Sequence, residues 1–113
     1  MSKRDSVLLS KILDEIVYAE TAVANLTFDE FMSDETIKRA TCMTLINIGE
    51  LARFLSEETK AAAPNIPFNE IIATRNVAAH GYQTLRFEDV WSTLKSDLPR
   101  LREEMEKLAD VFR

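Results

Sequence analysis

Glycine, proline and cysteine are scarce in this chain of 113 residues, which contains two glycines, three prolines and one cysteine. Tight turns between strands depend on glycine and proline, so their scarcity argues against a sheet with many short connections. Leucine, alanine, glutamate, lysine and arginine, which favour helices, are plentiful. We therefore predict a few long helices joined by short links.

The single cysteine, Cys42, excludes an internal disulfide. It falls on an apolar position of a helical pattern, so we expect a buried thiol. Long apolar runs are missing too, because no segment approaches the roughly eighteen apolar residues that a membrane span requires. The first residues contain no apolar signal core. We expect a cytoplasmic protein that does not enter a membrane.

Basic residues are fewer than acidic ones: the chain has 14 lysines and arginines and 19 acidic residues, which gives a net charge of −5. A protein of this charge has no long-range attraction to a polyanion, which excludes a general nucleic-acid coat. Any RNA contacts must be local, and the candidates are Arg75 and Arg86, with a partner or second subunit supplying more. The acidic exterior would also suit docking to a basic partner.

The first helix is predicted to begin at a cap at Asp5 or Ser6 and to end near Leu26. Its apolar positions recur at helical spacing, while the residues between them are charged. These positions are Leu8, Leu9, Ile12, Ile16, Val17 and Val23.

The second principal helix is predicted to be the longest, from a start at Ser33 or Asp34 through Lys60. Residues 27–30 before it have the spacing of a capping box and predict a short turn. The apolar face of this helix is wider than one partner helix covers, which predicts both a core and a dimer seam. The residues that broaden it are Met43, Leu45 and Phe54.

A third helix is predicted over residues 67–80, with Ile71, Ile72 and Val77 facing the core. A fourth begins near Arg86, Pro99 breaks or kinks it, and an amphipathic C-terminal helix follows. The predicted fold is a single all-α domain over residues 1–113, an up-and-down bundle of four principal helices plus a C-terminal helix, assembled as a homodimer.

The only histidine lies in residues 75–82, RNVAAHGY. On a helix, Asn76 and His80 share one face, and Arg75 lies one step round the cylinder. Gly81 suits the left-handed position just past a helix end. An arginine for phosphate charge, a histidine that carries a proton near neutral pH and the Tyr82 phenol are groups used on phosphodiesters. Alternatively, these side chains only cap carbonyls and cover a surface.

Glu50 follows Gly49 in an apolar stretch, where a carboxylate is costly to bury unless it is paired. Either it lies on a solvated helix face, or it orients Arg75 or His80. No metal and no cofactor are expected, because one histidine, one cysteine and scattered carboxylates supply no ligand cluster.

Four segments in order, spanning roughly residues 37 to 100, carry a family resemblance. They are INIGELA at 46–52, PNIPFNEI at 64–71, the R-N-x-x-x-H-x-Y spacing at 75–82, and VW with DLP at 90–91 and 97–99. They resemble the "IIGEAA", "PEIPWREI", motif and closing "VW…DLP" segments of the HEPN superfamily (higher eukaryotes and prokaryotes nucleotide-binding), specifically of its HepT-like toxins. The family often has an acidic residue where Arg86 stands, so a weaker helix cap is expected there.

The resemblance implies a metal-independent endoribonuclease in which the 2′-hydroxyl of RNA attacks the phosphate and a cyclic phosphate is left. His80 would act as acid or base, Arg75 would stabilise the developing charge, and Asn76 would orient His80 or a phosphate oxygen. Such a reaction needs one proton acceptor and one donor, yet the chain has a single histidine. A two-fold axis beside His80 would bring two histidines into one cleft, so we expect a homodimer.

The resemblance also implies the toxin of a type VII toxin–antitoxin system, encoded with an MntA-like minimal nucleotidyltransferase. That partner would silence the toxin by transferring AMP to the motif tyrosine, here Tyr82. The alternative is a non-catalytic HEPN subunit that serves only as an adaptor for the nucleotidyltransferase.

Overall fold

The computed structural model describes residues 2–111, and every regular element in this range is helical, which confirms the all-α class. The long elements are α1 (Lys3–Val23), α3 (Glu35–Arg53), α5 (Phe68–His80) and a continuous run of α6 (Phe87–Ser92), a π-helical turn (Thr93–Asp97) and α7 (Leu98–Val111). Two short helices, α2 (Phe28–Ser33) and α4 (Glu57–Ala61), and a 3₁₀ turn (Tyr82–Thr84) connect them.

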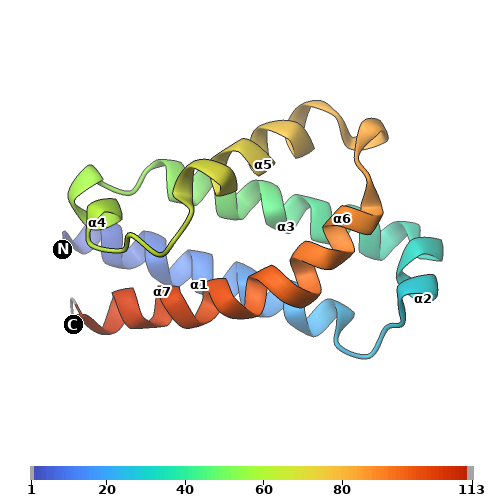
Figure 1. The fold of residues 1–113 in the computed structure, drawn as a ribbon, viewed down its shortest axis with the longest axis horizontal. Helices are drawn as coiled ribbons and strands as arrows, with labels where there is room; N and C mark the ends of the chain where they lie inside the picture. The colour runs from blue at the N-terminus through green and yellow to red at the C-terminus, as the bar shows by residue number, and fades with distance from the viewer. Residues whose placement is uncertain (1, 112–113) are drawn as a thin grey trace.

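Helix α3 is the centre of the bundle, because it packs against α1 on one side and α5 on the other. Helix α7 packs on α1, and Figure 1 shows it running along the bundle with α5 well above it. Helix α5 has few contacts with α7 and is held almost entirely by α3. The position of α5, and of any side chain on it, therefore depends on the α3–α5 contact.

The core is filled from α1, α3 and α7 at helical spacing, as the pattern predicted. Each fully buried aliphatic side chain contributes about 1.5–3 kcal/mol relative to exposure. Val17 is the exception on α1, since it is 51% exposed. It lies about 100° round the helix from the buried Ile16, which turns its side chain to solvent. Cys42 is buried as expected, and burial raises the pKa of its thiol.

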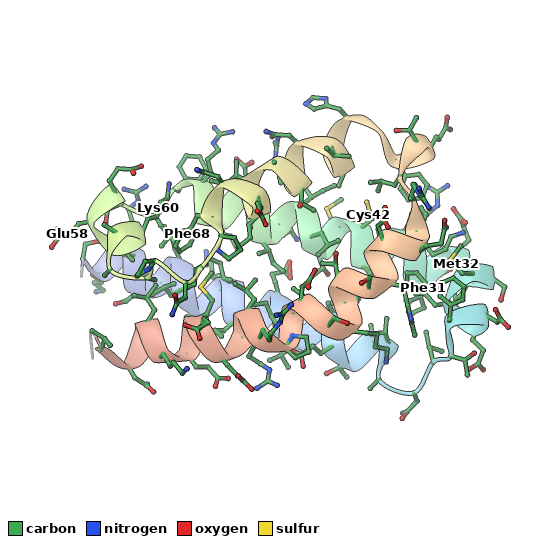
Figure 2. All side chains as sticks on the ribbon, in the orientation of Figure 1. Phe31, Met32, Cys42, Glu58, Lys60 and Phe68 are labelled. Atoms are coloured by element: carbon green, nitrogen blue, oxygen red, sulfur yellow. The ribbon has the colours of Figure 1, made fainter. Side chains whose placement is uncertain are left out.

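Aromatic side chains close the end of the bundle near α2. Phe31, which Figure 2 labels, is fully buried and packs against Trp91 with ring centroids 5.1 Å apart. Thr27 and Glu30 form the predicted capping box of α2, and Asp34 caps α3 as predicted. These local signals position α2 at the start of α3.

The predicted cap of α1 is wrong. Ser2 caps the helix by accepting from the Asp5 amide, and the Asp5 side chain instead lies buried beneath α4. The helix ends at Val23 rather than near Leu26. With 21 residues it is longer than α3, which has 19, so the prediction that the second principal helix is the longest is also wrong.

Helix α3 ends earlier than predicted because a separate cap follows it. Its last residue is Arg53, and Ser56 caps the short helix α4 by accepting from the Thr59 amide. Figure 2 shows Glu58 and Lys60 on α4 rather than on an extension of α3. A serine that can cap a new helix therefore outweighed the continuous helical pattern.

Pro99 alters the last helix without ending it. Proline lacks an N–H and its ring clashes with the carbonyl four residues earlier, here that of Lys95. The chain accommodates this with the π-helical turn directly before Leu98, and α7 then continues to Val111. Met105 and Leu108 are buried as predicted, Val111 is 73% exposed, and Phe112 lies outside the described residues.

Candidate active site

Gly49 sets the distance between α3 and α5 at the motif. A Cβ atom at this position would overlap the Cβ of Arg75 and lie 3.0 Å from the carbonyl oxygen of Ile71. Only a residue without a side chain allows the two helices to approach so closely. The contact places the Arg75 side chain beside residue 50 of α3.

Glu50 pairs with Arg75, one of the two alternatives that the sequence left open. The Arg75 Nε lies 2.9 Å from the Glu50 Oε2, and the Arg53 Nη1 lies 3.9 Å from the same oxygen. The closer contact is ionic, because among the described residues neither of its two atoms has a well-aligned hydrogen-bond partner. The Arg75 Nη1 donates to the Asn76 Oδ1 over 3.0 Å. Two side chains, Glu50 and Asn76, thus hold the guanidinium of Arg75.

This cluster has an excess of positive charge. Two arginines, Arg53 and Arg75, share the single carboxylate Glu50, so one positive charge is not neutralised. The Arg75 side chain is 23% exposed and that of Glu50 is 36% exposed. An ion pair with this much exposure contributes about 0–1 kcal/mol to stability, so its main effect is on orientation. An oriented arginine with excess charge suits a phosphate oxygen.

His80 is the last residue of α5 and is exposed. It lies five residues after Arg75, about 7.5 Å along the helix axis. Within residues 2–111 its imidazole makes no hydrogen bond or ion pair. The Asn76 Oδ1 accepts from Arg75, and no hydrogen bond joins Asn76 to His80 among these residues. The imidazole is left accessible to a substrate or to a second subunit.

Tyr82 lies in the 3₁₀ turn after α5 and contacts the beginning of α3. Its hydroxyl donates to the Glu35 Oε1 over 2.6 Å, the Arg39 guanidinium lies 4.7 Å from its ring centroid, and the Phe87 ring packs against it. Burial and the hydrogen bond to the Glu35 carboxylate raise the pKa of Tyr82. The same bond, with Lys38 and Arg39 nearby, lowers the pKa of Glu35. The phenol is therefore neutral and Glu35 charged at neutral pH.

The structure separates Tyr82 from Arg75. Their carboxylate partners, Glu35 and Glu50, are fifteen residues apart on α3, which corresponds to about 22 Å of helix. The site residues predicted from the sequence thus form two groups on one side of α3. Arg75, Asn76 and Glu50 are in contact, whereas His80 and Tyr82 lie further along the motif.

Gly81 does not have the predicted left-handed conformation. Its φ is −147° and its ψ is 45°, and no residue from 2 to 111 has a positive φ. The chain leaves α5 directly into the 3₁₀ turn, because the Thr84 amide and hydroxyl both donate to the Gly81 carbonyl over 2.8 Å. These bonds fix the chain just past α5 without a left-handed residue.

Several residues near the site were not found from the sequence. Arg53 could have been inferred, because it follows Glu50 by one helical turn. The contacts of Glu35 and Arg39 with Tyr82 join positions more than forty residues apart, and no local pattern indicates them. Arg86 pairs with Glu88 and Asp89 and makes no side-chain cap to α6, as expected of the weaker cap.

From residue 2 to residue 111, no three histidine, cysteine, aspartate or glutamate side chains are grouped so that they could hold a metal ion. In that range each helix is too short or too polar to pass through a bilayer.

A small helical domain with an oriented arginine, excess positive charge and an accessible histidine defines a class of protein that can act on phosphodiesters. Comparison with known protein families shows to which family of this class the chain belongs. The profile of the HepT-like ribonucleases, described as "Ribonuclease HepT-like", matches residues 12–108. The chain belongs to this family, whose enzymes are endoribonucleases.

Similar proteins cover nearly the whole chain. Two Methanocaldococcus jannaschii proteins provisionally named RNase MJ1380 and RNase MJ1216 are 29% and 30% identical over 107 and 109 residues. The matches cover 94% and 96% of this chain and 98% and 90% of those proteins. A Thermococcus cleftensis protein provisionally named ribonuclease HepT is 28% identical over 108 residues, 96% of this chain and 98% of its own. No solved structure matches the chain.

Proposed function

We propose that this chain is the toxin of a toxin–antitoxin pair and that it cleaves RNA without a metal ion. The observation that carries the proposal is the Arg75 guanidinium, which Glu50 and Asn76 hold in a cluster with one excess positive charge. A phosphodiester in contact with this cluster would have a fixed partner for its phosphoryl oxygens.

In the proposed reaction the 2′-oxygen of the ribose forms a bond to phosphorus, and the bond from phosphorus to the 5′-oxygen breaks. A base takes the proton of the 2′-hydroxyl and an acid gives a proton to the 5′-oxygen. The products are a 2′,3′-cyclic phosphate and a 5′-hydroxyl. Arg75 stabilises the charge that develops on the phosphoryl oxygens, and His80 carries one of the protons.

The second proton carrier would come from a homodimer, because one histidine cannot occupy both positions at once. Exposed apolar side chains on α3 and α5 support this assembly. Met43 is 55% exposed, Phe54 is 45% exposed and Val77 is 58% exposed. Burying these side chains against a second copy would remove their apolar surface from water.

The test of catalysis compares His80→Ala and Arg75→Ala with Arg100→Ala, an exposed arginine on α7. Loss of either catalytic group should reduce cleavage of a labelled RNA about a hundredfold or more. The control should keep wild-type activity. Cleavage should continue in EDTA and should fail on RNA that is 2′-O-methylated at the cut, since that oxygen is the nucleophile. Full activity of the His80→Ala variant would exclude the proposed catalysis and would favour the alternative, a non-catalytic adaptor.

We also propose that an MntA-like nucleotidyltransferase neutralises the toxin by transferring AMP from ATP to Tyr82. The phenol oxygen would bond to the α-phosphorus of ATP, pyrophosphate would leave, and the phenol proton would pass to a base of the transferase. The Tyr82 hydroxyl would exchange its bond to Glu35 for the new phosphate bond. The adduct would add bulk and negative charge near His80, which would repel RNA.

Mass spectrometry of the protein co-expressed with that nucleotidyltransferase should find one AMP adduct on the peptide containing Tyr82. Tyr82→Phe should carry no adduct and should stay toxic in the presence of the transferase. An adduct-free Tyr82 in a fully inhibited toxin would show that neutralisation takes another route.

A further inference from the structure

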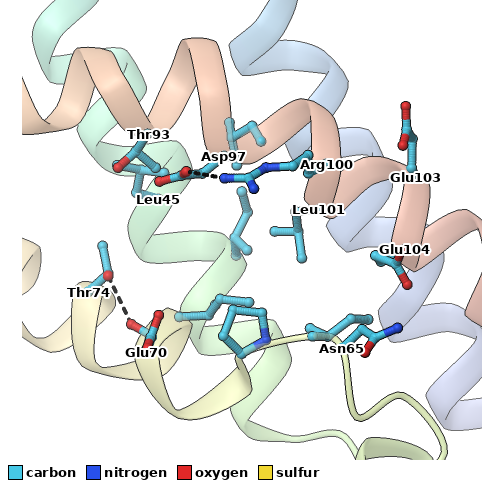
Figure 3. A pocket seen from close by; sticks show the side chains of 15 residues that line it. Leu45, Asn65, Glu70, Thr74, Thr93, Asp97, Arg100, Leu101, Glu103 and Glu104 are labelled. Carbon is cyan, nitrogen blue, oxygen red and sulfur yellow. Dashed lines mark hydrogen bonds and ion pairs between the residues drawn. The ribbon is translucent and has the colours of Figure 1, made fainter.

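A groove of about 540 Å³ runs between α5 and α7, and its lining does not include Arg75. Figure 3 shows its two walls, with Glu70 and Thr74 on α5 and Asp97, Arg100 and Glu104 on the opposite wall. Its floor is apolar and includes Leu45 and Ile48 of α3 and Leu98 and Leu101 of α7. The groove exists because α5 rests on α3 and has few contacts with α7. Its volume lies within the range of about 300–1,000 Å³ that is usual for binding pockets.

The rim of the groove is negatively charged, with four carboxylates and one arginine: Glu70, Asp97, Glu103, Glu104 and Arg100. Arg100 is neutralised by Asp97 over 3.2 Å, and Glu104 pairs with Lys107 over 3.3 Å. Glu70 and Glu103 have no ion pair among the described residues and lie on opposite walls. Both are exposed, so two unneutralised charges flank an apolar floor.

The π-helical turn that accommodates Pro99 also forms part of the groove wall. Thr93 and Asp97, its first and last residues, both line the hollow. Turns of this kind are rare and occur often at functional sites, because the wider helix shifts the side chains that follow it. Here the turn sets the side chains of one groove wall.

We propose that this groove docks an amphipathic helix of a partner protein, whose apolar side chains enter the groove and whose lysines or arginines meet Glu70 and Glu103. Helices bind apolar grooves through side chains spaced at i, i+3, i+4 and i+7, and the rim charge selects a basic helix. RNA is disfavoured because the rim would repel its phosphates. A symmetric contact between two copies is disfavoured at the groove, because the two acidic rims would face each other. The lining of the groove does not include Glu50, Arg75 or His80, so binding there can be tested separately from the proposed catalysis.

The experiment uses three synthetic peptides of about 18 residues, or five helical turns. The first has a leucine stripe flanked by lysines, the second has the same stripe flanked by glutamates, and the third has the composition of the first in scrambled order. Fluorescence anisotropy measures their affinities for the full chain. Amide chemical shifts in ¹⁵N-labelled protein show where each peptide binds.

The lysine peptide should bind at least tenfold more tightly than the other two and should shift amides of residues 66–74 and 93–104. The double substitution Glu70→Lys/Glu103→Lys reverses two rim charges. It should weaken binding of the lysine peptide about tenfold and should strengthen binding of the glutamate peptide. Asp29→Lys/Glu58→Lys changes the net charge equally, at exposed positions outside the groove, and should leave both affinities unchanged.

Equal binding of all three peptides, or shifts confined to the exposed face of α3, would overturn the proposal. So would a single-stranded RNA oligonucleotide that shifts the groove amides, since the occupant would then be a nucleic acid. If Glu70→Lys/Glu103→Lys changed the molar mass in light scattering, the groove would be a contact between copies of this chain. None of these results depends on RNA cleavage, so they test the groove separately from the proposed function.

Discussion

Gly49 acts on the site through the side chain that it lacks. The Arg75 Cβ and the Ile71 carbonyl occupy the space where a side chain of residue 49 would lie. Because both belong to α5, this one residue determines how closely the motif helix approaches α3. The ion pair from Arg75 to the neighbouring Glu50 depends on that approach.

Gly49→Ala should therefore separate the two helices, lower the free energy of unfolding by about 1–3 kcal/mol, as overpacking usually does, and reduce RNA cleavage as Arg75 moves. Gly81→Ala is the matched control. A Cβ there would meet the hydroxyl of Thr84, a side chain that can rotate away, and the backbone has no positive φ. Urea unfolding and a cleavage assay measure both changes. Equal effects of the two substitutions would contradict this role of Gly49.

Glu50 is a positioning residue in the same cluster. Its carboxylate holds Arg75 at 2.9 Å and also attracts Arg53. The exposure of the pair makes its contribution to stability small, so a neutral Glu50 should change the fold little. The two arginines account for a carboxylate at this position of α3.

At the scale of elements, Asp5 connects α1 to α4. Its side chain is 1% exposed, and the hydroxyls of Ser56 and Thr59 each donate to its Oδ2 over 2.6 Å. Burial raises the pKa of Asp5, but the hydrogen bonds from Ser56 and Thr59 outweigh burial and hold it below the ordinary value of 3.8. The charged carboxylate is therefore part of the joint between the two helices.

The pKa of Asp5 is lower in the folded than in the unfolded state, so its contribution to stability is present above about pH 4 and is lost as the pH falls through the folded pKa. Asp5→Asn should lower the free energy of unfolding at pH 7 by about 1–3 kcal/mol, since hydrogen bonds to a charged group are lost. The variant should also lose less of its free energy of unfolding than the wild type does between pH 5 and pH 3. Urea unfolding at several pH values measures this, with Asp29→Asn at an exposed position as the control. Parallel pH profiles for wild type and Asp5→Asn would exclude the predicted coupling.

At the scale of the whole molecule, the single histidine leads us to expect that activity depends on assembly. In a homodimer with both histidines in one cleft, each must be present for cleavage. The chain's net charge of −5 adds no long-range attraction to RNA, so we expect binding to rest on local contacts such as those of Arg75.

Mixing equal amounts of wild-type and His80→Ala chains, with exchange of subunits, should leave about a quarter of the activity, because only about one dimer in four then contains two intact histidines. Independent sites would leave about half. A matched mixture of wild-type and Arg100→Ala chains should keep full activity.

Light scattering should show a dimer at micromolar concentration. Met43→Asp, at an exposed position of α3, should shift the equilibrium towards monomers and reduce cleavage.

Local signals in the sequence determined the class of fold, the capping box at Thr27, the cap at Asp34 and the burial of the α1 stripe. They succeeded because helix periodicity and capping depend on residues within one or two turns. They failed for the cap of α1, for the end of α3 and for Gly81, where a nearby serine or threonine offered another set of backbone bonds.

The residue types of the site, Arg75, Asn76, His80 and Tyr82, were determined by the sequence, because their chemistry is local to each side chain. Which of them meet was decided only by the tertiary structure. The α3–α5 packing at Gly49 pairs Arg75 with Glu50, and the turn after α5 sends Tyr82 to Glu35, about 22 Å away along α3. The groove between α5 and α7 has the same origin, since contacts between distant segments depend on how helices pack and not on the spacing within any one of them.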